Sequence, residues 1–227
     1  MALKFYYDLL SAPCRMVYIF LRVNGIPFES RTYQLVKREH DNAEFEKINV
    51  FKKVPAIAHD GFNVMESVAI LRYLCREFKV ADHWYPREDS RAQARVDEYL
   101  EWQHLNVRKP LVAYLIAKAI LPMRTGQQSP PEELERLMKD MDACLDQIEN
   151  IWLRDGAIFL TGREISIADI VGACEIEHPR MVGYDPRKGR PKLSAWLDRV
   201  AKATSPHYED ALVRLEKVVV KKSFDID

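Results

Sequence analysis

The first 80 residues alternate between strand-like and helix-like hydrophobic patterns. Residues 3–7 form an apolar, aromatic run typical of a strand, and residues 17–21 carry a mostly apolar helix that stops at Asn24-Gly25. Residues 28–35 alternate apolar and polar side chains, which predicts a second strand. The charged, weakly periodic residues 37–49 are expected to form a loop with a short helix. The chain therefore opens as strand, helix, strand.

A hairpin followed by a helix gives the strongest local signal. Two apolar runs, residues 54–58 and 62–65, flank Asp60-Gly61, and Asp-Gly between such runs is typical of a tight hairpin turn. The apolar period then becomes helical. This pattern places Glu66 and Ser67 in the first turn of the helix, where unpaired N–H groups and the helix dipole favour a carboxylate ligand. A hairpin packed on a helix without any ligand fits the same spacing equally well.

Strand signals end after about residue 80, and only helical patterns follow. Residues 81–89 break the pattern and are predicted to be a linker. We therefore expect an α/β domain over residues 1–80 and an all-helical domain over residues 89–227. Its helices are expected at residues 90–121, with a kink or break at Pro110, and at 132–153, 170–177, 191–203 and 208–219, before a frayed tail at 221–227.

One polar motif in the second half of the chain, Ser166 to Asp169, predicts the start of a helix. Ser166 and Asp169 have the spacing of a capping box, in which each side chain binds the main chain at the start of a helix. Ile165 and Ile170 flank the box as a hydrophobic staple. We therefore interpret Asp169 as a structural residue that helps the buried helix after it to begin.

Composition excludes several classes of partner. The 227 residues contain 34 basic and 34 acidic side chains with a pI near 7.0, so we expect no nucleic-acid partner. No apolar run approaches the ~18 residues of a membrane span, and no signal peptide precedes the first strand, so we expect a cytoplasmic protein. The four cysteines, at positions 14, 75, 144 and 174, lack the spacing of zinc ligands, which predicts buried, reduced thiols and no metal.

The element order of residues 1–80 resembles a thioredoxin-like domain. That resemblance implies that Pro55, which opens the third strand, follows a cis peptide bond and faces the active site. An extended main chain beside such a strand start can pair with the main chain of a bound peptide. In thioredoxin-like proteins a C-x-x-C pair lies between the first strand and the first helix. Here Ser11 replaces the leading cysteine and only Cys14 remains, so no dithiol can form, which argues against a disulfide oxidoreductase.

A serine hydroxyl at a helix start can stabilise a thiolate that belongs to a ligand. A free thiol has a pKa of about 8.5, and lowering it by about two units requires about 2.7 kcal/mol. One hydrogen bond to a charged group, at about 1.5–3 kcal/mol, together with the helix terminus, at about 0.3–2 kcal/mol, can supply that energy. Ser11 needs to be neither a base nor a nucleophile. A plain N-cap is the alternative interpretation of this residue.

Five motifs together resemble the theta class of cytosolic glutathione transferases: S-x-P-C-R, K-K-V-P-A, E-S-V-A-I, R-V-D-E-Y-L and I-S-I-A-D, in this order from about residue 3 to about residue 199. The resemblance implies a glutathione transferase fold, with a thioredoxin-like domain followed by an all-helical domain. It also implies a homodimer that uses glutathione as co-substrate, without a cofactor. The implied reactions are conjugation of glutathione to hydrophobic electrophiles or reduction of organic hydroperoxides. The site residues it implies are Ser11 for thiol activation, His40, Lys53, Val54, Glu66 and Ser67 for glutathione, and Arg108 for the electrophile.

Three alternatives remain open from the sequence. Cys14 could be the nucleophile of a thiol transferase, although it falls inside the opening turns of a predicted helix. Tyr6 or Tyr7 could replace Ser11 as the hydroxyl donor, because other classes of the family use a tyrosine at the end of this strand. A glutathione-fold protein that binds apolar ligands without catalysis is the third alternative.

Overall fold

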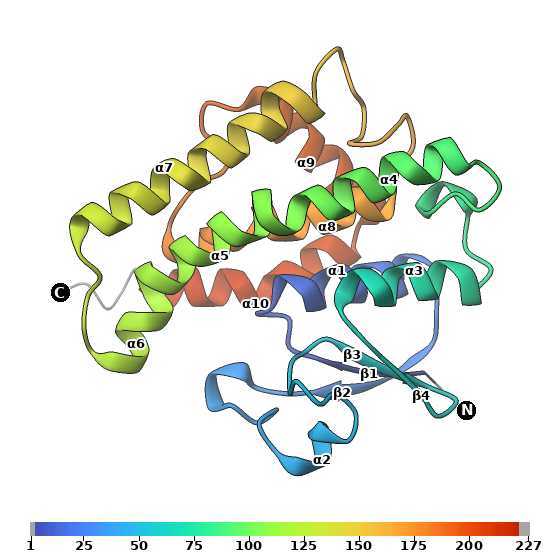
Figure 1. The fold of residues 1–227 in the computed structure, drawn as a ribbon, viewed down its shortest axis with the longest axis horizontal. Coiled ribbons are helices and arrows are strands. Elements are labelled where there is room, and N and C mark those ends of the chain that lie inside the picture. The colour runs from blue at the N-terminus through green and yellow to red at the C-terminus, as the bar shows by residue number, and fades with distance from the viewer. Residues whose placement is uncertain (1–2, 223–227) are drawn as a thin grey trace.

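The computed structural model describes residues 3–222, with side chains up to Lys217. It consists of an α/β part at the N-terminal end and a larger part made of helices (Figure 1). This is the predicted fold class, a thioredoxin-like domain followed by an all-helical one. The boundaries at residues 80 and 89 stay a prediction, and most of the expected tail, residues 223–227, lies outside the described residues.

The sheet has four strands in the order β2-β1-β3-β4. β1 is parallel to β2 and antiparallel to β3, and β3 is antiparallel to β4. The turn between β3 and β4 holds Asp60 at φ 49° and Gly61 at φ 85°, the positive values that a tight hairpin turn requires. The strands are β1 (Leu3–Tyr7), β2 (Phe28–Thr32), β3 (Ala56–His59) and β4 (Phe62–Met65).

The second strand is shorter than the alternation of its residues predicts. β2 ends at Thr32, and a 3-10 turn, η1 (Leu35–Lys37), follows it. The reason is a tertiary contact, because the main-chain N–H of Leu35 donates a hydrogen bond to the Asp8 carboxylate at 2.9 Å instead of to a strand. The prediction of a strand as far as Leu35 was wrong at this end.

Three helices accompany the sheet. α1 (Ala12–Val23) and α3 (Ser67–Glu77) lie on the face that meets the helical part, whereas α2 (Ala43–Glu46) lies on the opposite side (Figure 1). α1 buries most of its residues because it packs on the sheet, on α3 and on the helical part at once. The residue before α1 is Ser11, so the start of this buried helix fixes where Ser11 lies.

The helical part is built around one long, interrupted helix and α8. Its described elements are η2 (Asp82–Trp84), α4 (Ser90–Gln103), η3 (His104–Arg108), α5 (Lys109–Leu115), η4 (Ile116–Ile120), α6 (Leu121–Thr125), α7 (Pro131–Gln147), η5 (Ile148–Trp152), α8 (Ile167–Ile176), η6 (His178–Val182), α9 (Pro191–Thr204) and α10 (His207–Lys222). All of α8 is buried, and α1 packs against both α8 and α10. These contacts join the helical part to the helix that Ser11 begins.

Pro110 does not break the long helix. α4 passes into α5 through η3, a π-helical segment that ends two residues before the proline. A proline inside a helix removes one N–H and clashes with the carbonyl of the preceding turn. The wider π turn accommodates both effects and lets the helix continue.

The capping box that the sequence predicts is present. The Ser166 hydroxyl accepts a hydrogen bond from the N–H of Ala168 at 3.2 Å, and the Asp169 carboxylate accepts one from the N–H of Ser166 at 2.9 Å. Asp169 also accepts hydrogen bonds from the Leu160 N–H and from the Trp196 indole. The structural interpretation of Asp169 is confirmed.

Candidate active site

Three of the predicted site segments meet at one end of the sheet. Tyr6, near the end of β1, pairs with Ala56, the first residue of β3, and Ala56 pairs with Met65, the last residue of β4. The end of β1, the start of β3 and the end of β4 therefore lie side by side. The loop to Ser11, the Val54–Pro55 bond and Glu66 all follow or precede these three residues, so the topology brings them together.

Ser11 stands at the N-cap position of α1 and is half-buried. Its N–H donates to the Asp8 carbonyl at 2.9 Å, and its carbonyl accepts from the Cys14 and Arg15 N–H groups at 3.0 and 3.1 Å. Its hydroxyl makes no capping hydrogen bond. The main chain of Ser11 is thus held by hydrogen bonds at both its N–H and its carbonyl, whereas its hydroxyl does not cap the helix and interacts with the Cys14 thiol.

Val54 precedes a cis peptide bond to Pro55, as the thioredoxin-like resemblance implies. β3 begins only at Ala56, and among the described residues the main chain of Val54 has no hydrogen-bond partner. A main chain without internal partners next to a strand can pair with the main chain of a bound peptide. The side chain of Val54 is half-buried against the sheet.

Glu66 has an unusual main-chain conformation at the start of α3. Its φ of 67° and ψ of 114° fall in a region that non-glycine residues rarely occupy. Such conformations cost about 1–3 kcal/mol and cluster at ligand-binding sites. The exposed Glu66 side chain caps no N–H group, and Ser67 begins the helix beside it. The first turn of α3 therefore presents a carboxylate, a hydroxyl and free N–H groups together.

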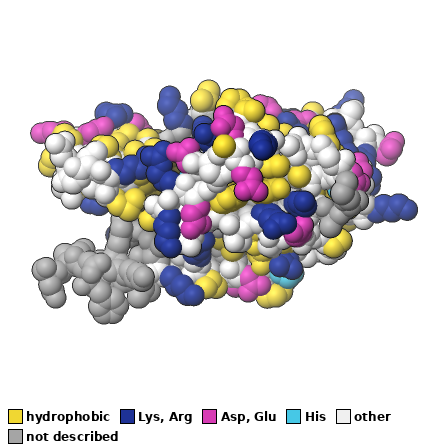
Figure 2. Space-filling model, turned by 90° about the horizontal axis from the view of Figure 1, so that it is seen from below, with side chains coloured by type: hydrophobic (Ala, Val, Ile, Leu, Met, Phe, Trp, Pro, Cys, Tyr) yellow, Lys and Arg dark blue, Asp and Glu magenta, His cyan; other side chains and the backbone are white. Residues whose placement is uncertain are grey.

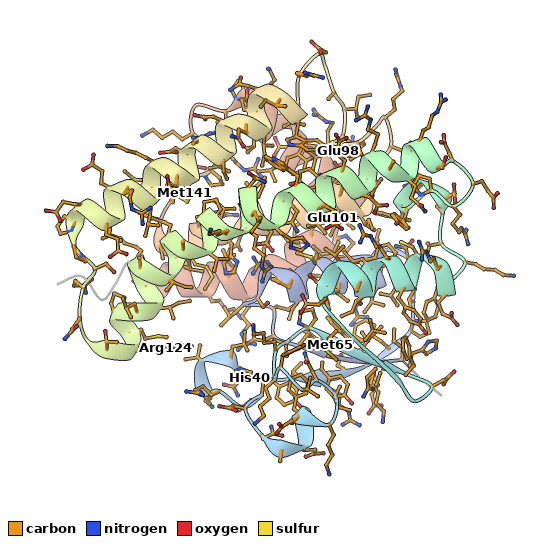
Figure 3. The ribbon with its side chains drawn as sticks, viewed as in Figure 1. His40, Met65, Glu98, Glu101, Arg124 and Met141 are labelled. Atoms are coloured by element: carbon orange, nitrogen blue, oxygen red, sulfur yellow. The ribbon has the colours of Figure 1, made fainter. Side chains whose placement is uncertain are left out.

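His40 and Lys53 lie on two neighbouring loops of the α/β part. His40 is half-buried and its Nδ1 has no hydrogen-bond partner among the described residues (Figure 3). Lys53 is exposed. The basic residues next to them are neutralised, because Lys52 pairs with Glu46 and Asp41 at 3.1 and 3.6 Å. Among the described residues neither His40 nor Lys53 forms an ion pair, so both side chains can bind an anion.

The two tyrosines of β1 are engaged elsewhere. The Tyr7 hydroxyl lies 3.3 Å from the Ser30 hydroxyl, and the Tyr7 ring stacks on Phe5. Tyr6 packs in a separate cluster with Phe45 and Ala56, and burial raises the pKa of its hydroxyl. A phenol with a raised pKa holds its proton firmly. Both contacts support packing roles for these tyrosines.

Arg108 does not belong to the sheet end, because it ends η3 in the helical part. Its guanidinium lies 2.5 Å from the carboxylate of Glu175 on α8, which is fully buried. Burial raises the pKa of Glu175, and the Arg108 and Arg15 guanidiniums oppose that rise. The arginine is 38 % exposed, so one face of it reaches solvent while the other neutralises a buried charge. No motif in the sequence pointed to Glu175.

Cys14 is unsuited to be a nucleophile in this structure. Its side chain is fully buried, and burial raises the pKa of its thiol to about 12, with hydrogen bonds from the Asp8 main chain and the Ser11 side chain opposing that rise. A reactive cysteine needs an exposed thiolate. The thiol-transferase alternative therefore has no support in the geometry of α1.

Three features of the described chain concern its possible contacts with metal ions, membranes and charged partners. Over residues 3–217, no group of three His, Cys, Asp or Glu side chains lies close enough to hold a metal ion. No helix of the described chain is both long and apolar enough to cross a bilayer. Acidic and basic side chains intermingle on the face that carries the sheet (Figure 2), which agrees with the balanced composition.

Sequence reasoning missed the residues that hold the site loops. The buried Asn49 side chain donates a hydrogen bond to the Lys53 carbonyl at 2.7 Å and accepts one from the Phe51 N–H at 3.0 Å. Asp8 does the same for the loop before Ser11, because it accepts from the Leu10 N–H at 3.0 Å. The signal for Asp8 was its position directly after the apolar run of β1, whereas nothing in the charged segment around Asn49 marked that residue.

Comparisons with known proteins agree with this geometry. Residues 4–76 match the family model "Glutathione S-transferase, N-terminal domain", and residues 111–203 match "Glutathione S-transferase, C-terminal domain". The chain is 46% identical to glutathione S-transferase theta-3 of Mus musculus over 200 residues, 88% of this chain and 82% of that protein.

Solved structures extend the match to the fold. The apo form of human glutathione-S-transferase T1-1 has a TM-score of 0.89 and 43% identity, covering 98% of this chain and 91% of the other. Human glutathione transferase theta-2 in complex with glutathione and an unknown ligand has a TM-score of 0.91 and 37% identity, covering 97% and 90%. The chain therefore belongs to the theta class of the glutathione S-transferase family.

Proposed function

We propose that this enzyme uses Ser11 to ionise the thiol of bound glutathione, and that the resulting thiolate attacks an electrophilic carbon of a hydrophobic substrate to form a glutathione conjugate. One observation carries the residue assignment: Ser11, the unpaired main chain of Val54 and the first turn of α3 meet at one end of the sheet. Glutathione is a peptide with a carboxylate at each end and a thiol between them, so it can use all three.

The chain offers one partner to each portion of the tripeptide. Glu66 and Ser67, with the free N–H groups of α3, suit the charged γ-glutamyl end, because a carboxylate binds an ammonium and a helix start binds a carboxylate. Val54 pairs with the main chain of the cysteinyl residue. His40 and Lys53 lie beyond Val54, where they face the glycyl carboxylate.

The Ser11 hydroxyl then donates a hydrogen bond to the sulfur. This bond stabilises the thiolate more than the thiol, so it lowers the pKa of the bound thiol and raises the fraction of nucleophile at neutral pH. The N-terminus of α1 adds to the effect because its dipole favours negative charge. Ionisation and positioning of the sulfur together account for the acceleration.

We expect the electrophile to approach from the helical part, in which Arg108 ends η3. Its partly exposed guanidinium can stabilise negative charge that develops on a leaving group, while Glu175 fixes its orientation from the buried side. This role for Arg108 rests on the resemblance and on its position on η3.

Steady-state kinetics with a chromogenic electrophile tests the assignment. Ser11→Ala should lower kcat/KM about 10- to 100-fold at pH 6.5 while changing the KM for glutathione less than about threefold. Tyr7→Phe is the matched control, because it removes a hydroxyl from the same strand end and should leave kcat/KM within about twofold. A loss confined to Tyr7→Phe would refute the role of Ser11.

We also propose that the protein is a cytoplasmic homodimer, as its class membership suggests. In this arrangement the α/β part of one subunit contacts the helical part of the other. Light scattering at micromolar concentration tests the dimer, and a monomer mass there would end this proposal.

A further inference from the structure

The loop that leads to Ser11 is held by side chains that tie it to the helical part. We propose that Arg214 of α10, acting through Asp8, is a positioning residue for Ser11, so that the helical part controls the reactivity of the bound thiol. This inference rests on the proposed role of Ser11. It assigns a catalytic consequence to a contact between residues near the two ends of the chain.

Asp8 is the centre of the arrangement. Its side chain is fully buried and lies 2.6 Å from Nη1 of Arg214. The same carboxylate accepts hydrogen bonds from the Leu10 N–H at 3.0 Å and from the Leu35 N–H at 2.9 Å. The Asp8 carbonyl accepts the hydrogen bond of the Ser11 N–H at 2.9 Å. A displacement of Asp8 therefore moves the residue that bears the catalytic hydroxyl.

The carbonyl groups of the same loop are held from the other side. Arg15 is fully buried, and its Nη1 donates to the Leu9 and Leu10 carbonyls at 3.0 and 3.1 Å. Its Nη2 donates to the Cys174 carbonyl of α8 at 3.1 Å. The Leu10 N–H of the loop is thus bound by the Asp8 carboxylate, and the Leu9 and Leu10 carbonyls are bound by the Arg15 guanidinium. Both side chains contact the helical part, Asp8 through Arg214 and Arg15 through the Cys174 carbonyl.

The chemistry explains why Arg214 is needed. A buried carboxylate is costly unless a cation or several hydrogen bonds compensate it, and Arg214 is the cation in direct contact with Asp8 among the described residues. Without Arg214 the Asp8 carboxylate gains by moving toward water. The loop before Ser11 then shifts, and the Ser11 hydroxyl no longer points at the sulfur of bound glutathione. Arg214 is 38 % exposed, so its substitution opens no cavity in the core, and its cost in stability comes from the buried Asp8 carboxylate that loses its cation.

The test compares Arg214→Gln with Lys217→Gln. Lys217 is an exposed lysine three residues further along α10, so its variant removes the same charge from the same helix without touching the loop. The readout is the ultraviolet titration of the thiolate of enzyme-bound glutathione. Arg214→Gln should raise the pKa of the bound thiol by about 0.5 unit, which lowers kcat/KM about twofold at pH 6.5 and little at pH 9. Lys217→Gln should leave both values unchanged, and Arg214→Lys should retain most of the wild-type pKa.

A double variant separates this inference from the proposed function. If Arg214 acts through Ser11, adding Arg214→Gln to Ser11→Ala should cause no further shift in the pKa of the bound thiol. Equal shifts from Arg214→Gln with and without the Ser11 hydroxyl would overturn the positioning role. If Ser11→Ala shifts the pKa and Arg214→Gln does not, only this inference fails. If Ser11→Ala itself causes no shift, the proposed function fails as well.

Discussion

The polar groups at the sheet end around Ser11 and those in the buried centre around Asp169 differ in how many hydrogen-bond partners they have within the protein. Asp169 is fully buried, and four donors satisfy its carboxylate: the Leu160 N–H, the N–H and hydroxyl of Ser166, and the Trp196 indole. At the sheet end the Val54 main chain and the Nδ1 of His40 lack partners among the residues described, and Glu66 adopts a rare backbone conformation. The polar groups around Asp169 are all paired within the protein, whereas those at the sheet end have positions open to a ligand.

The comparison teaches how to separate structural polar groups from functional ones. Both regions contain a carboxylate near a helix start, and both lie near buried elements. The two regions differ in whether their polar groups have hydrogen-bond partners within the protein. A polar group with a structural role is paired by other residues of the fold, whereas a group that binds a ligand is unpaired or has a strained backbone in the free protein. The predictions below test that distinction from the largest expected effect to the smallest.

Asp169→Ala should cause the largest change in stability. The variant leaves the Leu160 N–H, the Ser166 N–H and the Trp196 indole buried without acceptors, so the free energy of unfolding should fall by about 4 kcal/mol. Chemical denaturation measures the loss, and Asp169→Asn, which keeps one acceptor oxygen, should lose about half as much. A loss below about 1 kcal/mol for Asp169→Ala would show that the hydrogen bonds of Asp169 contribute little to the stability of the fold.

Arg108→Leu should destabilise the protein in a pH-dependent way. Burial raises the pKa of Glu175 and Arg108 opposes the rise, so without Arg108 the folded-state pKa moves further above its unfolded value. The folded variant then binds a proton that the unfolded chain releases, and its stability falls as pH rises through that window. We expect a loss of about 2 kcal/mol at pH 8 and less than about 1 kcal/mol at pH 5, from denaturation at both pH values.

The control for Arg108→Leu removes the buried charge as well. Adding Glu175→Gln should recover most of the stability at pH 8, because no unpaired carboxylate then remains. An equal loss at both pH values, with no recovery in the double variant, would mean that Arg108 contributes through packing rather than by neutralising Glu175.

Glu66→Gln should weaken ligand binding without weakening the fold. The substitution keeps the backbone and shape but removes the charge, so the Kd for glutathione should rise about tenfold while the free energy of unfolding changes by less than about 0.5 kcal/mol. Calorimetry and denaturation give the two quantities. Glu77→Gln, at the other end of α3, is the matched control and should alter neither. If Glu66→Gln mainly changed the free energy of unfolding, Glu66 would be a structural residue like Asp169.

Cys14→Ala should have the smallest effect on activity. With a pKa of about 12 the Cys14 thiol is ionised to a fraction of only about 10⁻⁵ at pH 7, so kcat/KM should stay within about threefold of wild type. The native protein should also resist iodoacetamide at Cys14, as peptide mass analysis would show. Loss of turnover in Cys14→Ala would revive the thiol-transferase alternative.

The sequence predicted the local features well. Asp60-Gly61 gave the hairpin, and the spacing of Ser166 and Asp169 gave the capping box, because in both cases the interacting groups are within a few residues of each other. The theta-class motifs led to the family in the same way. The placement of Ser11 beside Val54 and Glu66 follows from the strand order that these motifs imply.

What the sequence could not give were contacts between distant positions. Nothing in the pattern around Asp8 indicates that Arg214 neutralises it, and nothing around Arg108 indicates Glu175. The π-helical segment before Pro110 was also out of reach, because the packing of the long helix decides whether a proline breaks it or only widens one turn.

A titration of the thiol of enzyme-bound glutathione tests the central claim most directly, with wild type, Ser11→Ala and Tyr7→Phe measured side by side. We expect a pKa about two units below the ~8.5 of a free thiol in the wild type and in Tyr7→Phe, and a value within about half a unit of the free thiol in Ser11→Ala. An unchanged pKa in Ser11→Ala together with a raised one in Tyr7→Phe would contradict the account and assign the hydroxyl donor to β1.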